Sequence, residues 1–321
     1  MTAFVLLGDV MMDVTASVTE AINHGSDTAA TVTWQPGGSA ANTARWLAWA
    51  GQSTSLIGCI GGDPQGAMVR EALVRDGVAP LMRTAAESRT GTCIVIVEPT
   101  GERTMLPDAG ANALLTPADL PEGAFASDGH LHLSGYTLLR EATRAVGMAA
   151  LRLARESGMS TSLDASSAAP IRARPDAFDD ALGLVDLLVA NADEAVALTG
   201  ARDPQEAGTV LATRARALVV VKLGPQGALG FDGGEQQRAA SVASVIVDTT
   251  GAGDAFAAGL LASWTTGSPL QQALQRGNEL AAVAVGRVGA GPPTTQGQEC
   301  STGGPFPSNW PAQPPAPIER D

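Results

Sequence analysis

The chain has 321 residues, 45% of them hydrophobic, and a formal net charge of −13. This length suffices for one large α/β domain with a full core, and the acidic balance argues against a nucleic-acid-binding surface. The apolar run 4–7 is too short for a signal or membrane segment, and the three cysteines lack metal or redox spacing, so we expect a cytoplasmic protein with no membrane partner.

Short apolar runs alternate with helical patterns along most of the chain. The runs predict strands at 4–7, 55–60, 92–97, 130–133, 160–163, 186–190 and 218–221. The patterns predict helices at 39–50, 65–76, 140–157, 193–198, 204–214, 254–264 and 270–288. Strands alternating with helices indicate an α/β fold with a mostly parallel central sheet, flanked by helices on both faces.

Two segments interrupt this alternation, at about 14–36 and 89–107. Both contain short runs of alternating apolar and polar residues, so we expect antiparallel strands that project from the main sheet. The segment 292–321 is rich in proline and glycine, which makes it a poor candidate for a packed core. We therefore predict one domain over 1–291 and a disordered tail.

The sequence Asp248-Thr-Thr-Gly-Ala-Gly-Asp254 joins a small-residue loop to an apolar helix. The N–H groups at a helix start lack intrahelical partners, and the helix dipole favours anions there. Gly251 and Gly253 leave the main chain open to an oxyanion, and Asp254 beside it could accept a proton from an attacking hydroxyl. This arrangement suits phosphoryl transfer to an alcohol. A turn with Asp254 as a helix cap is the alternative.

A second glycine–helix junction lies at Gly37-Gly38-Ser-Ala-Ala-Asn42. Asn42 is polar in the first turn and can donate and accept hydrogen bonds, which suits recognition of neutral hydroxyls. A structural cap is the alternative here as well.

Together these two segments resemble the two signatures of the ribokinase-like sugar kinases, the PfkB family. Further matches follow in the expected order: Gly8-Asp9 and Asp13, then Asn191-Ala-Asp-Glu194, then Lys222-Leu-Gly224-Pro-Gln-Gly227. The resemblance covers roughly residues 3 to 291. It implies a ribokinase-like fold in which the two interrupting segments form a small β-sheet lid over the acceptor.

The resemblance implies an ATP-dependent kinase with Asp254 as general base, and with Gly251, Ala252 and Gly253 forming an anion hole. Its nucleotide-side positions fall on Asn191, Lys222, Gly224, Gly227 and Asn278. Glu194 matches the position that organises Mg²⁺, directly or through water, and Asp248 with Thr250 resembles part of a monovalent-cation site, which makes K⁺ dependence a hypothesis. A capping box of Asn191 and Glu194 and a solvated surface lysine at 222 are the alternatives.

On the acceptor side the resemblance points to Asp13, Gly38 and Asn42, with Arg103 and Asp164 as weaker candidates. Arg103 follows a hairpin turn and would favour an acidic sugar if it faces the acceptor. Asp164 ends a strand, where α/β enzymes place ligand-binding groups. Asp13 as a simple turn residue is the alternative.

The sequence has no P-loop motif and no dinucleotide-binding glycine pattern after its first strand. We therefore expect phosphoryl transfer from ATP, with Mg²⁺, to a small sugar or sugar acid. A nucleoside kinase is the alternative: 4% aromatic residues offer few platforms for a base, but Trp34 near the lid keeps this alternative open. A catalytically silent sugar sensor is a further alternative. The resemblance also makes a homodimer through the lid an open hypothesis.

Overall fold

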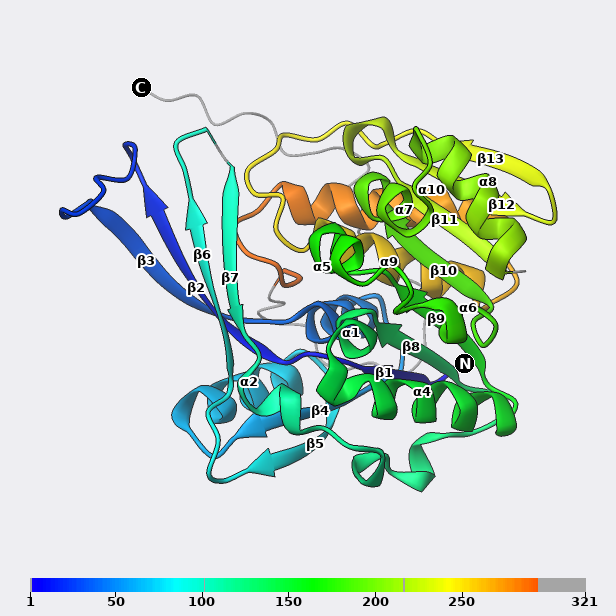
Figure 1. Cartoon of the computed structure of the whole chain (residues 1–321), viewed down its shortest axis with the longest axis horizontal. Helices are drawn as coiled ribbons and strands as arrows, with labels where there is room; N and C mark the ends of the chain where they lie inside the picture. Colours follow the sequence, from blue (N-terminus) through cyan, green and yellow to red (C-terminus); the bar gives the residue numbers. More distant parts are fainter. Residues whose placement is uncertain (1, 101, 216, 294–321) are drawn as a thin grey trace.

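The computed structural model describes residues 2–100, 102–215 and 217–293. Within them a nine-stranded sheet has the order β13-β12-β11-β10-β9-β8-β1-β4-β5 (Figure 1). Its strands are β1 (Phe4–Leu7), β4 (Thr54–Gly61), β5 (Val78–Ala85), β8 (His130–Ser134), β9 (Ser160–Asp164), β10 (Leu187–Asn191), β11 (Leu218–Lys222), β12 (Ala228–Asp232) and β13 (Glu235–Ala239). The predicted tail lies outside the described residues from 294 onward, and the division at 291 stays a prediction.

The strands from β11 across to β5 are all parallel, whereas β12 and β13 add an antiparallel edge. Successive residues of β10 enter opposite cores, with Leu187 and Val189 on one face and Leu188 and Ala190 on the other. This continuous burial explains the uninterrupted apolar runs. The predicted mostly parallel central sheet is confirmed.

Helices cover both faces of the sheet, as predicted. One core packs against α1 (Ser39–Trp49), α2 (Pro64–Arg75), α9 (Ala252–Trp264) and α10 (Leu270–Val285). The other packs against α3 (Tyr136–Leu139), α4 (Glu141–Glu156), α5 (Ala168–Ala173), α6 (Asp179–Leu182), α7 (Ala192–Thr199) and α8 (Pro204–Ala215). In the described part of the chain, no helix is long and apolar enough to cross a membrane.

A separate four-stranded sheet extends to one side of the body (Figure 1). It consists of β2 (Met11–Val18), β3 (Ala30–Gly37), β6 (Gly91–Val97) and β7 (Arg103–Asp108), in the order β3-β2-β6-β7. Each hairpin is antiparallel, as predicted, but the two hairpins join through parallel pairing of β2 with β6. We call this sheet the lid.

The carboxyl ends of the parallel strands bring four polar residues to one edge of the main sheet. Ser134, Asp164, Asn191 and Lys222 end β8, β9, β10 and β11, and the register places Ser134 opposite Asp164 and Asn191 opposite Lys222. Ligands of open α/β sheets bind outside this edge. The two glycine–helix junctions also lie at this edge, because Ser39 of α1 and Lys222 of β11 both reach the start of α9.

Candidate active site

Gly251 forms the junction between the 248–251 turn and α9. Its φ of 74° lies in the left-handed region, and a Cβ there would sit 2.6 Å from the Ala290 carbonyl oxygen. Only glycine fits both constraints. The turn therefore presents the N–H groups at the start of α9 with no side chain at Gly251 or Gly253 in front of them, and the Ala252 N–H donates to the Thr249 carbonyl oxygen over 3.3 Å.

Asp254 lies in the first turn of α9 and faces the first turn of α1. The Ser39 hydroxyl donates to Oδ1 over 2.8 Å, and the Asn42 amide donates to Oδ2 over 3.1 Å. The Asn42 Oδ1 atom is buried and lacks a hydrogen-bond partner among the described residues. A hydroxyl of the phosphoryl acceptor could therefore donate to the Asn42 Oδ1 atom, beside the Asp254 carboxylate. The sequence suggested Asn42, whereas Ser39 was missed, although it lies within the same Gly-Gly-Ser-Ala-Ala-Asn segment.

The pKa of Asp254 is raised to about 7, mainly by burial and in addition by the nearby Asp164 charge. Hydrogen bonds from Ser39 and Asn42 and the charge of Lys222 act in the opposite direction. A carboxylate with a pKa near neutrality has the proton affinity that a general base needs. Asp254 can thus accept a proton at physiological pH and release it afterwards.

Lys222 carries a buried positive charge at the centre of the site. Its ammonium donates to the Asp164 carboxylate over 2.8 Å, and its side chain is only 14% exposed. Burial alone would lower its pKa, but the charges of Asp164, Glu194 and Asp254 outweigh that effect and raise it to about 12. The alternative of a solvated surface lysine is therefore wrong.

Asn191 and Glu194 form the capping box that was the structural alternative for this pair. Asn191 donates to both Glu194 oxygens over 2.7 Å, and the Glu194 N–H donates back to Asn191 over 2.8 Å. Burial raises the pKa of Glu194 to about 7. This reciprocal cap starts α7 and does not preclude a second role, because each carboxylate oxygen can accept more than one hydrogen bond.

Carboxylate oxygens are the ligands that Mg²⁺ prefers, and Asp164 and Glu194 supply them near the start of α9. The described residues contain no group of three or more His, Cys, Asp or Glu side chains that could hold a metal ion. This set fits Mg²⁺ bound mainly by phosphate and water, which is how this reluctantly dehydrated ion usually binds.

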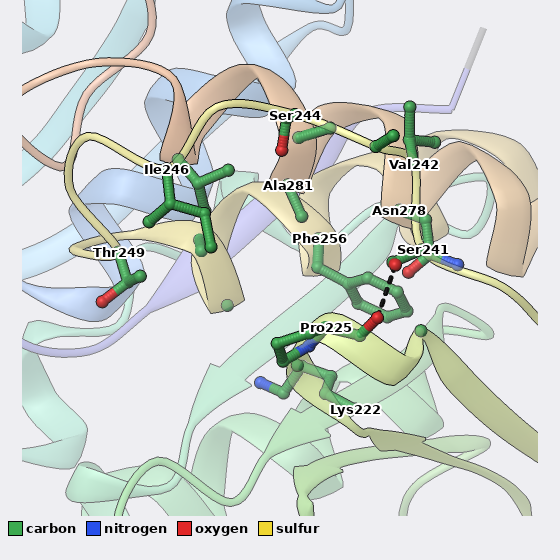
Figure 2. Close-up of a pocket in the computed structure, with 17 residues that line it drawn as sticks. Lys222, Pro225, Ser241, Val242, Ser244, Ile246, Thr249, Phe256, Asn278 and Ala281 are labelled. Carbon is green, nitrogen blue, oxygen red and sulfur yellow. Dashed lines mark hydrogen bonds between the residues drawn. The ribbon is translucent and has the colours of Figure 1, made fainter.

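A pocket of about 390 Å³ leads from the start of α9 toward α10 (Figure 2). Lys222 and Pro225 lie on one side, and Val242, Ser244 and Ile246 lie on the other. Six predicted site residues line it: Lys222, Gly224, Gly227, Ala252, Gly253 and Asn278. The largely apolar lining suits a flat heterocycle, with phosphates directed toward Gly253.

Asn278 and Gly227 shape the far end of this pocket. The Asn278 amide donates to the carbonyls of Ala239 and Ala240, over 3.3 and 3.0 Å. Gly227 has a φ of 88°, and a Cβ there would sit 2.0 Å from the Ala239 carbonyl oxygen. Both residues therefore hold the 239–240 backbone against the pocket. Asn191 is not among the residues that line it.

On the acceptor side, Asp13 lies where the lid meets the body. Its carboxylate packs against Gly37, where a Cβ would come within 2.1 Å of it, and burial raises its pKa to about 6. Gly38 has a φ of 98°, and a Cβ there would sit 2.3 Å from the Asp9 carbonyl oxygen. These constraints place Asp13 and the start of α1 side by side.

Sequence reasoning missed an ion pair near this point. Arg140 donates to both oxygens of the buried Asp9, over 3.0 and 2.9 Å. Tyr136 is close enough to Asp9 and Asp254 for their charges to raise its pKa, although burial is the main cause of the rise to about 12. No local sequence pattern signals this cluster, because Asp9 and Arg140 are 131 residues apart.

Arg103 does not contact Asp13, Asn42 or Asp164 through any hydrogen bond or ion pair in the structure. Its guanidinium donates to the Asp248 carboxylate and to the Thr249 hydroxyl. The Asp248 carboxylate also accepts from the N–H groups of Thr250, over 2.7 Å, and Gly289, over 2.9 Å. Of the two residues assigned to a monovalent-cation site, Asp248 thus contacts a protein cation, whereas Thr250 contacts Asp248 through its N–H group.

Comparison with known proteins supports the architecture. The family described as pfkB family carbohydrate kinase matches residues 1–296. A fructokinase of Klebsiella pneumoniae is 34% identical over 235 residues, 71% of this chain and 76% of the relative. An ATP-dependent ribose-1-phosphate kinase of Halopiger xanaduensis is 34% identical over 268 residues, which cover 79% of this chain and 81% of the relative. An adenosine kinase structure from Sinorhizobium meliloti superimposes with a TM-score of 0.83 at 26% identity, over 91% and 96% of the chains.

Proposed function

The chain belongs to the pfkB family of carbohydrate kinases, and from this premise we propose that it transfers the γ-phosphoryl group of ATP to a hydroxyl of a small sugar or sugar acid. One observation carries the assignment of roles. Asp254, with a pKa of about 7, directly follows Ala252 and Gly253, which line the pocket at the start of α9. A base and an anion-binding helix start therefore meet at one point.

In this proposal Asp254 accepts the proton of the attacking hydroxyl as the oxygen–phosphorus bond forms. A general base contributes about 10²–10⁴ in rate. The N–H groups of Ala252, Gly253 and Asp254 hold the transferring group, and losing one such donor costs about 10²–10³ in rate. Ser39 and Asn42 orient the carboxylate through their hydrogen bonds to its two oxygens.

Lys222 lies beside the same point, since its Nζ atom is 3.3 Å from where a Cβ at Gly253 would be. We assign it to the phosphates of the nucleotide in the 390 Å³ pocket. Bound Mg²⁺ would neutralise phosphate charge, and Asp164 and Glu194 would hold it, directly or through water. The lid would exclude water, which competes with the sugar as acceptor.

The two faces of the lid support one acceptor class over the other. Trp34 pairs with Val14, whereas Asp13 pairs with Gln35, so Trp34 and Asp13 lie on opposite faces. Gln35 reaches Gly289 of the body, and Trp34 is 54% exposed. Trp34, the aromatic residue that would favour a nucleoside base, thus lies on the lid face opposite to Asp13. This supports a sugar or sugar acid, and a nucleoside remains the second candidate because an adenosine kinase shares the fold.

The proposal is tested by ADP release from Mg-ATP with a panel of sugars, sugar acids and nucleosides. Turnover with a sugar or sugar acid, lost in Asp254→Asn, supports it. Turnover only with nucleosides selects the second candidate. Sugar binding by calorimetry that is equal in both proteins, without turnover on any acceptor, selects a silent sensor.

We further propose that the outer lid face pairs with a second copy of the chain. One cross-strand row on this face consists of Trp34, Val14, Ile94 and Leu106. Trp34, Ile94 and Leu106 are each about half exposed, and exposed apolar patches mark contact surfaces. Light scattering should give a dimer mass for the wild type and for Val210→Glu, which changes an exposed apolar residue on α8, and a monomer mass for Trp34→Glu. A monomeric wild type would refute this pairing.

A further inference from the structure

A lid arginine completes the turn that precedes the anion hole. Arg103 begins β7, yet its guanidinium reaches across to Asp248 and Thr249 in the body. The side chains of Arg103 and Asp248 are each only 16% exposed. Thr249 also lines the nucleotide pocket. The contact therefore joins the lid to the wall of the pocket, 145 residues away in the sequence.

Asp248 ties two loops together at this point. Its Oδ1 atom accepts from Thr250 and Arg103, and its Oδ2 atom accepts from Gly289. Gly289 belongs to the segment that also packs against Gly251, through Ala290. The carboxylate thus positions both the 248–251 turn and its support. The charge that balances it comes from Arg103.

A monovalent metal ion at Asp248 would need oxygen ligands with free lone pairs and no competing positive charge. The guanidinium already contacts this carboxylate, and its positive charge would repel a second cation bound to the same group. An arginine side chain is always charged and needs no binding equilibrium. Its cation is therefore present at any salt composition.

We propose that Arg103 takes the place of a monovalent cation in this protein, so that the 248–251 turn is ordered, and the anion hole formed, without K⁺. The part of this inference that concerns turnover rests on the proposed kinase function. Because the cation comes from the lid, the turn is complete only when the lid covers the cleft. Arg103 is therefore a positioning residue: it orders the 248–251 turn, and with it the anion hole, when the lid closes over the acceptor.

The test compares thermal unfolding of the full chain in KCl and in choline chloride at equal ionic strength. The wild type should unfold at the same temperature in both salts. Arg103→Ala exposes the Asp248 carboxylate, so K⁺ should stabilise it. At ten times the dissociation constant the folding equilibrium rises about 11-fold, which raises the unfolding temperature by about 2–4 °C. Arg155→Ala, which removes an exposed pair with Asp186, should show no salt preference.

Stabilisation of the wild type by K⁺ over choline would overturn the inference, as would an Arg103→Ala variant that ignores the nature of the cation. If Arg103→Ala does not fold, Arg103→Met replaces it and is read in the same way, and the wild-type comparison stands by itself. Turnover provides a separate measurement: the wild-type kcat should be equal in both salts, and the variant should require K⁺. Absence of all kinase activity would refute the proposed function and leave the unfolding result intact.

Discussion

Replacing Asp254 by asparagine should make the protein more stable at high pH while it removes catalysis. The side chain keeps its shape, and its environment can adapt. The Asn42 amide can still donate to the remaining carbonyl oxygen, and the Ser39 hydroxyl can rotate to accept from the new amide. The substitution therefore removes a buried charge without leaving a donor unpaired.

The magnitude follows from the raised pKa of Asp254. Burial raises it from 3.8 to about 7, so between these pH values the folded state holds a proton that the unfolded state has released. The free energy of unfolding then falls as pH rises through this window. At 1.36 kcal/mol per pKa unit, the loss between pH 4 and pH 8 is about 4 kcal/mol for this group. The raised pKa values of Asp13 and Glu194 also lower the free energy of unfolding as pH rises, and these two contributions remain in the variant.

Urea unfolding at pH 4, 6 and 8 measures this difference, and ADP release measures the rate. The free energy of unfolding of Asp254→Asn should exceed that of the wild type by a margin that grows with pH and reaches about 4 kcal/mol at pH 8. The kcat of the variant should be lower by about 10²–10⁴. Asp203→Asn makes the same chemical change at the exposed start of α8 and should alter neither quantity. An identical pH dependence in Asp254→Asn and the wild type, or a variant that keeps a tenth of kcat, would refute this reasoning.

Three further substitutions separate the roles within the site. Asn42→Ala removes a hydrogen bond that lowers the pKa of Asp254, so the midpoint of the pH dependence of kcat/KM should move upward, and a downward shift would contradict this. Gly253→Ala should fold, because the new Cβ would meet only the Lys222 Nζ atom, at 3.3 Å. Its kcat should fall by about 10²–10³, and a change confined to KM would argue against the anion hole. Lys222→Met leaves Asp164 buried without its cation and should cost about 3–5 kcal/mol in urea unfolding, so wild-type stability would refute the buried pair.

The parallel sheet and its flanking helices could be predicted because buried strands read as short, continuous apolar runs. Three main-sheet strands were missed. β12 (Ala228–Asp232) is a short buried run that contains a glycine, β13 (Glu235–Ala239) is largely polar and lies at the sheet edge, and β5 (Val78–Ala85) is an edge strand in which only the two end residues are buried. The lid hairpins were predicted from local alternation, but the parallel pairing of β2 with β6 joins segments about 80 residues apart and leaves no local signal.

The candidate site was predictable where its chemistry lies within one short segment. Asp254 with Gly251, and Asn42 with Gly38, each lie beside their own helix start, and the resemblance to the two kinase signatures assigns them to the site. Long-range partners were not predictable. The contact of Arg103 with Asp248 and the pair of Asp9 with Arg140 depend on how the lid and α4 dock, and the sequence gives no sign of either.

The most direct test of the central account follows ATP and its products by ³¹P NMR, with Mg²⁺, an active acceptor and either the wild type or Asp254→Asn. Transfer to a hydroxyl predicts that each ADP appears with one new phosphate monoester signal, and that both signals vanish together in the variant. ADP accompanied by inorganic phosphate, or equal ester formation by Asp254→Asn, would contradict a kinase that uses Asp254 as its base.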